Sequence, residues 1–124
     1  MKSYYQKKGA FTLPKSIYQS TRKYIACYDT YIDLLDNINS KSPVKITEDD
    51  SNNRIVLETN IKIIEDSLNE YVRAEYRKAV FEHCAKNVPY KELEMKYYIA
   101  IGTMKEWTQR YAYGVAKNRG EVFD

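Results

Sequence analysis

Apolar side chains recur at alternating spacings of four and three residues through most of this 124-residue chain, a period that an α-helix turns into one continuous face. No segment shows a convincing strand-like alternation. The sequence therefore predicts an all-α fold of about five helices. One stripe comprises Ile17, Thr21, Tyr24, Tyr28, Tyr31, Leu35 and Ile38, and a second comprises Leu57, Ile61, Ile64, Leu68 and Tyr71.

The first stripe predicts one helix of about 22–25 residues that begins at Pro14 and ends near Asn39. A polar loop over residues 40–53, expected to be poorly ordered, separates it from the second helix. Two helices joined in this way form an antiparallel hairpin, which we assign to residues 14–71. The first stripe can pack on the other helices, or part of it can form a dimer interface, and the sequence leaves both uses open.

Residues 72–120 are predicted to form a three-helix unit. Its first helix covers about residues 72–85 and ends before Pro89, which opens a short second helix. A tight connection at Tyr98 leads into a third helix over about residues 101–117, and Gly120 stands where a C-terminal cap glycine is expected. Apolar residues fall where two steeply crossing helices need core contacts, namely Val88, Leu93, Tyr97, Ile99, Ile101 and Met104.

The net charge of +3 is small, but the charges are segregated along the chain. Residues 1–23 carry +6, residues 48–70 carry −5 and residues 88–119 carry +3. Basic ends suit a polyanion and an acidic middle suits a protein partner, although two solvated faces would give the same pattern. We expect residues 1–13 to form a mobile basic arm and residues 121–124 to form a short tail.

The sequence gives little support to enzymatic or metal chemistry. Cys27 and Cys84 lie far apart within helical apolar patterns, so we expect buried, reduced thiols. The single histidine, His83, cannot form a zinc site of about four ligands. Without a phosphate-binding loop or a nucleophile paired with a base, we expect no catalysis, no metal and no cofactor. No apolar run approaches the ~18 residues of a membrane span, so we expect no membrane contact.

The third helix of the C-terminal unit has the features of a DNA-reading helix. Gly102 and Thr103 are small enough to let its leading end approach the major groove, which is about 12 Å wide. Arginine can bind guanine edges through two hydrogen bonds, and glutamine can bind adenine edges in the same way. The expected base contacts are Thr103, Lys105, Glu106, Gln109 and Arg110. The expected phosphate contacts are Tyr90, Lys91, Lys96, Tyr113, Lys117 and Arg119.

The run from Val88 to Trp107, VPYKELEMKYYIAIGTMKEW, resembles the helix-turn-helix of region four of bacterial sigma factors without a gap. YRKAVF at 76–81, W-x-x-R-Y at 107–111, VAKNRG at 115–120 and the IYxxT…YIxxYDxY pattern at 17–31 are similar to phage and prophage regulators of the RinA and ArpU type. The resemblance covers nearly the whole chain. It implies a sequence-specific, double-stranded-DNA-binding regulator of phage late genes in the cytoplasm of a bacterial host. RNA polymerase and a second copy of the chain are the further partners to expect.

Three positions depart from the pattern of that family. Glu94 replaces a small alanine, and Tyr98 replaces a turn glycine with positive φ. Ala100 replaces a serine or threonine that would cap the second helix, a change that typically costs ~1 kcal/mol. Together they predict a turn of altered geometry, in which Glu94 can point outward.

Two other functions remain open on the sequence. A DNA-packaging factor of the small-terminase type is also helical, but such proteins usually carry their DNA-binding helices before the oligomerisation helices, the reverse of the order here. A phage-encoded inhibitor of a host protein that keeps the helix-turn-helix only as a scaffold is the other function, which the three departures leave open. An assembly of roughly eight or more subunits would indicate packaging, and absence of duplex binding at low salt would indicate the inhibitor.

Overall fold

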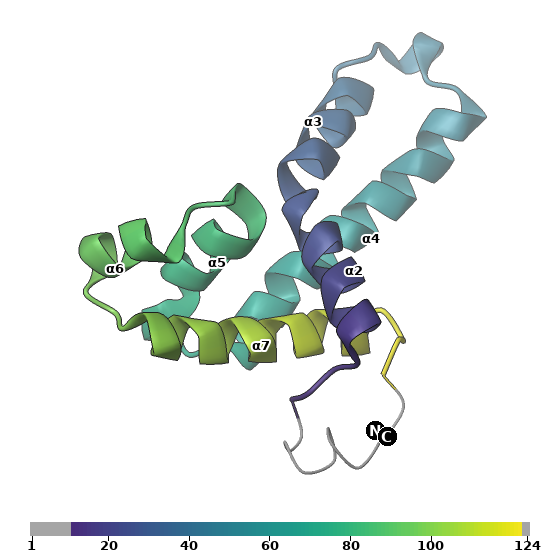
Figure 1. Cartoon of the computed structure of the whole chain (residues 1–124). Helices are drawn as coiled ribbons and strands as arrows, with labels where there is room; N and C mark the ends of the chain where they lie inside the picture. The colour runs from purple at the N-terminus through teal and green to yellow at the C-terminus, as the bar shows by residue number, and fades with distance from the viewer. Residues whose placement is uncertain (1–10, 123–124) are drawn as a thin grey trace.

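The computed structural model describes residues 11–122, and all the regular structure in that range is helical (Figure 1). The all-α prediction is therefore confirmed. Six α-helices occur in this part of the chain: α2 (Lys15–Ala26), α3 (Tyr28–Asn39), α4 (Glu48–Tyr71), α5 (Arg77–Lys86), α6 (Tyr90–Tyr97) and α7 (Ile101–Asn118). Two short 3-10 helices, η1 (Pro43–Lys45) and η2 (Ala74–Tyr76), lie between them. Over the described range, no helix combines the length and the apolar character that crossing a bilayer requires.

The single helix predicted over the first apolar stripe is wrong, because the chain bends at Cys27 and continues as two helices. Cys27 has φ −85° and ψ 3°, and its N–H donates to the carbonyl of Tyr24 at 3.2 Å, a bond one residue shorter than in an α-helix. The bend has a packing cause, since α2 lies against α7 and α5 whereas α3 lies along α4 (Figure 1). Cys27 is only partly buried at this bend, in contrast to the buried thiol that the sequence predicts.

The helices α3 and α4 form the predicted antiparallel hairpin, whose end at η1 projects away from α6 and α7, while the other end of α4 packs on α7 (Figure 1). The expected loop over residues 40–53 is wrong, because α4 already begins at Glu48. Thr47 caps this helix: its hydroxyl accepts the N–H of Asp50 at 3.0 Å, while the Asp50 carboxylate accepts the N–H of Thr47 at 3.1 Å. The same carboxylate binds Lys41 at 2.8 Å. The Thr-x-x-Asp spacing at 47–50 is the sequence signal for this start.

Most of the first apolar stripe is used inside the molecule. Tyr24 and Ile25 of α2 are buried in the main core together with residues of α4, α5 and α7. The hydroxyl of Tyr111 in α7 donates to the carbonyl of Ile64 in α4 at 3.0 Å, so the buried tyrosine has a partner. The remaining members of this core are Val72, Val80, Cys84, Ala85 and Val115. Tyr24 and Ile25 of the stripe thus pack within the chain.

The segment leading into α2 packs on α7, although the sequence predicts it to be part of a mobile arm. Leu13 is 6% exposed and belongs to a second core with Ala112, Tyr113 and Ala116 of α7. The ring of Phe11 meets that of Tyr113 edge-on at 5.4 Å. Residues 1–10 of the predicted arm lie outside the described residues, as do residues 123–124 of the predicted tail. Val122 of that tail packs against the second core.

Candidate nucleic-acid interface

The helices α5, α6 and α7 form the predicted three-helix unit around a small core of their own. Ala79 of α5, Leu93 of α6 and Met104 of α7 are at most 1% exposed and meet in one cluster. Partly buried side chains surround it, namely Val88, Tyr90, Tyr97, Ile99 and Ile101. Because these are the positions that the spacing predicts, the register of α6 against α7 is confirmed.

The first helix of this unit begins at Arg77 and not near residue 72. Val72 is extended at φ −122° and ψ 130°, and Arg73 is extended as well. The side chain of Arg77 donates to the carbonyl of Val72 at 2.7 Å and to that of Asn69 at 2.9 Å. The arginine thus satisfies carbonyl groups at the C-terminal end of α4, which explains why the chain leaves the helical path there.

The turn between α6 and α7 depends on Tyr98. Its φ of 57° and ψ of 42° are left-handed, and its N–H donates to the carbonyl of Glu94 at 2.9 Å. The altered geometry predicted for this turn is therefore not found at Tyr98, which adopts the conformation that a glycine would adopt. Two smaller predictions are confirmed: Glu94 is exposed, and Ala100 makes no side-chain cap.

The first turns of α7 carry an exposed polar edge. A side chain at Gly102 would have open space around it, so the packing of the described residues does not require a glycine there. Lys105, Glu106 and Gln109 are exposed, and Thr103 is partly buried. Four of the five residues predicted to contact bases therefore lie along a part of α7 that a ligand can reach.

Arg110, the fifth predicted base contact, is held against the protein. Its guanidinium lies 4.5 Å from the ring centroid of Trp107 and 4.8 Å from that of Phe11. It also pairs with the Glu106 carboxylate at 3.3 Å, one helical turn away. The shared outward face predicted for α7 does not extend to Arg110 in this conformation. Spacing along α7 could not reveal the contact, because Phe11 is far away in the sequence.

Tyr113 is wrongly predicted as a phosphate contact. Tyr113 is 7% exposed, and its ring packs edge-on against the rings of Phe11 and Tyr71, with 5.4 Å and 6.0 Å between the ring centroids. The prediction fails because the stripe of α7 that faces the protein is wider than the sequence suggests. Residues 111–116 are all buried, since α7 packs against α2 and α4 as well as against α5 and α6.

The cations predicted to contact phosphates differ in their surroundings. Lys91 of α6 is exposed and has no ion pair within residues 11–122, whereas Lys96 pairs with Glu82 at 3.1 Å. Lys117 is exposed near the C-terminal end of α7. The guanidinium of Arg119 lies 3.9 Å from the ring centroid of Tyr24 and pairs with Glu121 at 3.5 Å. Of these cations, Lys96 and Arg119 are therefore held in ion pairs, and Lys91 is not paired within the described range.

Tyr90 has a role that the sequence does not reveal. Its ring stacks on that of His83, with 3.6 Å between the ring centroids. The Nδ1 atom of His83 lies 2.8 Å from the carbonyl oxygen of Val88, to which it donates when that nitrogen carries the proton. Burial lowers the pKa of His83, so a neutral imidazole supports the start of α6.

A cavity of about 530 Å³ lies where α2 approaches α6 and α7. Lys105 and Gln109, two of the predicted base contacts, line its α7 side, and Tyr90 lines its α6 side. The other lining residues come from α2 and the segment before it, namely Thr12, Leu13, Lys15, Tyr18 and Arg22. The sequence does not predict this contribution of α2, because the residues involved are far apart along the chain.

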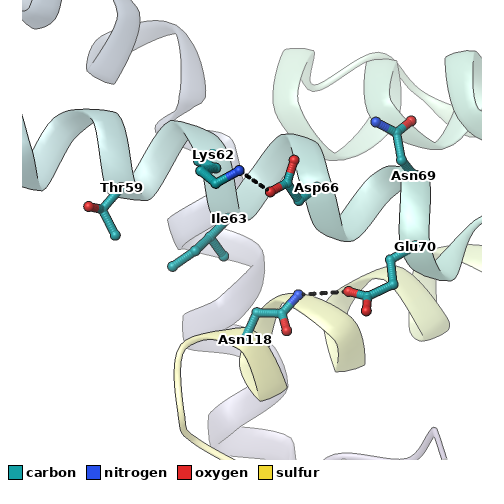
Figure 2. A pocket seen from close by; sticks show the side chains of 7 residues that line it. All are labelled: Thr59, Lys62, Ile63, Asp66, Asn69, Glu70 and Asn118. Atoms are coloured by element: carbon teal, nitrogen blue, oxygen red, sulfur yellow. Dashed lines mark hydrogen bonds and ion pairs between the residues drawn. The ribbon is translucent and has the colours of Figure 1, made fainter.

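A second hollow, of about 830 Å³, follows the outer side of α4 near the end of α7 (Figure 2). Its polar side chains are largely paired with one another: Lys62 binds Asp66 at 2.9 Å, and Asn118 donates to Glu70 at 3.1 Å. The two carboxylates that line it would repel a phosphate backbone. This face therefore does not suit DNA.

Comparison of the chain with protein-family models, with curated proteins and with solved structures finds no match.

Proposed function

We propose that the protein is a sequence-specific, double-stranded-DNA-binding transcriptional regulator, phage-encoded and acting on phage late genes, whose recognition helix is α7. The observation that carries the proposal is the three-helix unit in which α6 and α7 meet across a tight turn and leave the first turns of α7 exposed. A helix of about 10–12 Å diameter fits a major groove of about 12 Å width. The open space around Gly102 lets the leading end approach the bases.

Base reading is assigned to the exposed edge of α7. Gln109 can bind adenine through two hydrogen bonds, and Lys105 can bind the acceptor atoms of guanine. Glu106 can accept a hydrogen bond from cytosine, and Thr103 can contact either a base or a thymine methyl group. Arg110 adds a guanine contact once it leaves Glu106 and its two aromatic neighbours.

Phosphate contacts are assigned on both sides of this edge. Lys91 and Lys96 lie on α6, and Tyr90 lies at its first position. Lys117 and Arg119 lie at the far end of α7, roughly 20 Å along the helix from Lys105 at 1.5 Å per residue. Such contacts fix the register of the protein on the duplex without reading sequence.

Partner binding is assigned to the projecting end of the α3–α4 hairpin. Large apolar side chains are exposed there: Leu34 is 47%, Val56 is 57% and Ile55 is 63% exposed, while Val44 in η1 is 91% exposed. We propose that this surface holds a second copy of the chain, so that two recognition helices address two half-sites. RNA polymerase is the other partner that an apolar and acidic hairpin could engage.

The test is selection of bound fragments from random duplex DNA, followed by affinity measurements at several salt concentrations. We expect one preferred site and binding that weakens steeply with salt. Gln109→Ala should flatten the sequence preference, because it removes a base contact. Lys91→Gln should weaken binding to all sites alike and reduce the salt slope by about one unit.

Lys62→Gln is a matched control, since it removes the same charge from the outer side of α4, the face that does not suit DNA (Figure 2). It should leave DNA affinity unchanged. Equal losses from Gln109→Ala and Lys91→Gln at all sites would contradict the recognition-helix assignment. A mass measurement separates the remaining alternatives: one or two subunits agree with regulation, whereas a large ring would indicate packaging. Absence of duplex binding at low salt would favour an inhibitor of a host protein.

A further inference from the structure

We propose that the cavity between α2, α6 and α7 binds one phosphate group, held by Lys15, Arg22 and Lys105. The class of ligand follows from the cavity itself. Its identity as a backbone phosphate of duplex DNA rests on the proposed function. On this proposal α2 is part of the DNA-binding surface, although it lies outside the unit formed by α5, α6 and α7.

The first argument is the charge of the cavity. Three of its eight lining residues are cationic and none is acidic. None of these three cations forms an ion pair within residues 11–122. Elsewhere on the protein ion pairing is common, as for Lys41, Lys86, Lys96 and Arg119. Like charges gathered around one hollow repel each other, and an anion in that hollow would remove the repulsion.

The second argument is the state of Arg22. Its Nη1 atom donates to the Tyr18 hydroxyl at 3.0 Å, and its Nε atom is buried without a hydrogen-bond partner. A guanidinium has five N–H donors in a planar fork that matches the oxygens of a phosphate, so Arg22 retains unused donors. A phosphate in the cavity can therefore accept from guanidinium N–H groups other than the one that binds Tyr18.

The third argument is the set of neutral donors. The hydroxyl groups of Thr12, Tyr18 and Tyr90 and the side-chain amide of Gln109 belong to residues that line the same cavity. Each can donate to a phosphate oxygen. A volume of about 530 Å³ is also larger than a single phosphate group fills, so the group that fits is one attached to a larger molecule, as in a nucleic-acid chain.

The fourth argument is the position of the cavity beside α7. Lys105 and Gln109 lie about one turn apart on α7 and line the cavity, and Glu106 on the exposed edge of the helix directly follows Lys105. A duplex that receives α7 in its major groove brings a phosphate strand along each side of that helix. The cavity therefore lies where one of those strands would pass. Lys105 then serves as a link between base reading and phosphate binding.

The experiment has two arms, both on the full chain. In the first, inorganic phosphate is titrated at constant ionic strength, with chloride as the replaced anion, and amide chemical shifts are followed by NMR. In the second, the affinity for the selected duplex is measured against salt. The variants are Lys15→Gln, Arg22→Gln and Lys105→Gln. The matched control is Lys23→Gln, which removes the same charge from an exposed position of α2 outside the cavity.

We expect phosphate to change the amide chemical shifts of residues around Tyr18, Tyr90 and Gln109. Chloride at equal ionic strength should leave those chemical shifts unchanged. Each cavity variant should weaken phosphate binding about tenfold and reduce the salt slope for the duplex by about one unit, and Lys23→Gln should change neither. Because Lys15 is an exposed first residue of α2, its variant should fold even if Arg22→Gln does not.

The two proposals fail in different ways. Loss of phosphate binding in the cavity variants together with no duplex binding by the native chain supports the phosphate site and overturns the regulatory function. In the opposite case the native chain binds the duplex, and Lys15→Gln and Lys105→Gln bind it as tightly as Lys23→Gln does. If the phosphate titrations of these variants are also unchanged, the proposed phosphate site is overturned and the regulatory function is kept.

Discussion

The ring of Phe11 covers the guanidinium of Arg110, with 4.8 Å between the ring centroid and the guanidinium carbon. Trp107 lies on the same guanidinium at 4.5 Å, and Glu106 pairs with it at 3.3 Å. The segment that leads into α2 therefore contacts the helix to which we assign base reading. A cation placed over an aromatic ring in this way gains roughly 0.5–1 kcal/mol at exposed sites, so each ring biases Arg110 towards the stacked state without locking it there.

Phe11→Ala should release Arg110. The free energy of unfolding should fall by about 1–2 kcal/mol, because a partly buried ring and its edge contacts with Tyr113 and Tyr71 are lost. Duplex affinity of the folded protein should rise about two- to fivefold, the factor that corresponds to one lost cation–π contact. Denaturant unfolding and titration with the selected duplex measure the two effects.

The double variant Phe11→Ala with Arg110→Ala is the control for that experiment. It should lose the gain in affinity, since the arginine that Phe11 restrains is no longer present. An affinity that is the same for the native protein and for Phe11→Ala would show that the stacked arginine has no part in DNA binding.

The two glycines of α7 should respond in opposite ways to alanine. At Gly114 a Cβ atom would lie 2.2–2.7 Å from three ring atoms of Tyr71, so Gly114→Ala should lower the free energy of unfolding by about 1–3 kcal/mol. At Gly102 nothing lies within 4 Å, so Gly102→Ala should raise it by about 0.5 kcal/mol through helix propensity. Thermal unfolding of the two variants, measured side by side, checks both signs.

Gly102→Ala also tests function separately from stability. If the leading end of α7 lies close to the bases, the added methyl group should weaken duplex binding while the protein becomes more stable. A variant that is more stable and binds DNA as tightly as the native chain would place the groove contact elsewhere.

The sequence predicts which residues form helices better than it predicts which distant segments those helices contact, and the reason is physical. The spacing of Leu93, Tyr97 and Met104 fixes which faces of α6 and α7 meet, because a side-chain period is a local property. The bend at Cys27 escapes the same reasoning, since the apolar stripe continues through it and only the positions of α7 and α4 require it. The contact between Phe11 and Arg110 and the approach of α2 to Lys105 join distant parts of the chain, so no local pattern contains them.

His83 should make stability depend on pH. Burial lowers its pKa below the ordinary value of 6.5, the charge of nearby Arg22 acts in the same direction, and the hydrogen bond to the Val88 carbonyl opposes them. The unfolded chain therefore takes up the proton first as pH falls. The stabilising contribution is complete above about pH 6.5 and is lost as the pH falls below it, towards the lower pKa of the folded state.

His83→Asn keeps a side-chain donor for the Val88 carbonyl and removes the titration. Denaturant unfolding between about pH 7.5 and pH 5.5 should show a smaller loss of stability for this variant than for the native protein. Parallel profiles for the two proteins would mean that His83 has the same pKa in the folded and unfolded states.

Tyr98 offers the clearest gain in stability, because a bulky residue holds a left-handed conformation with φ 57° while its side chain is 91% exposed. Tyr98→Gly removes the conformational cost and almost no burial, so the free energy of unfolding should rise by about 1 kcal/mol.

Asn87 also has a left-handed conformation, with φ 60°, at the end of α5. Asparagine tolerates that region, so Asn87→Gly should change stability by only a few tenths of a kcal/mol, roughly the limit of the method. Chemical denaturation compares the pair directly, and equal effects at the two positions would show that the turn between α6 and α7 stores no strain at Tyr98.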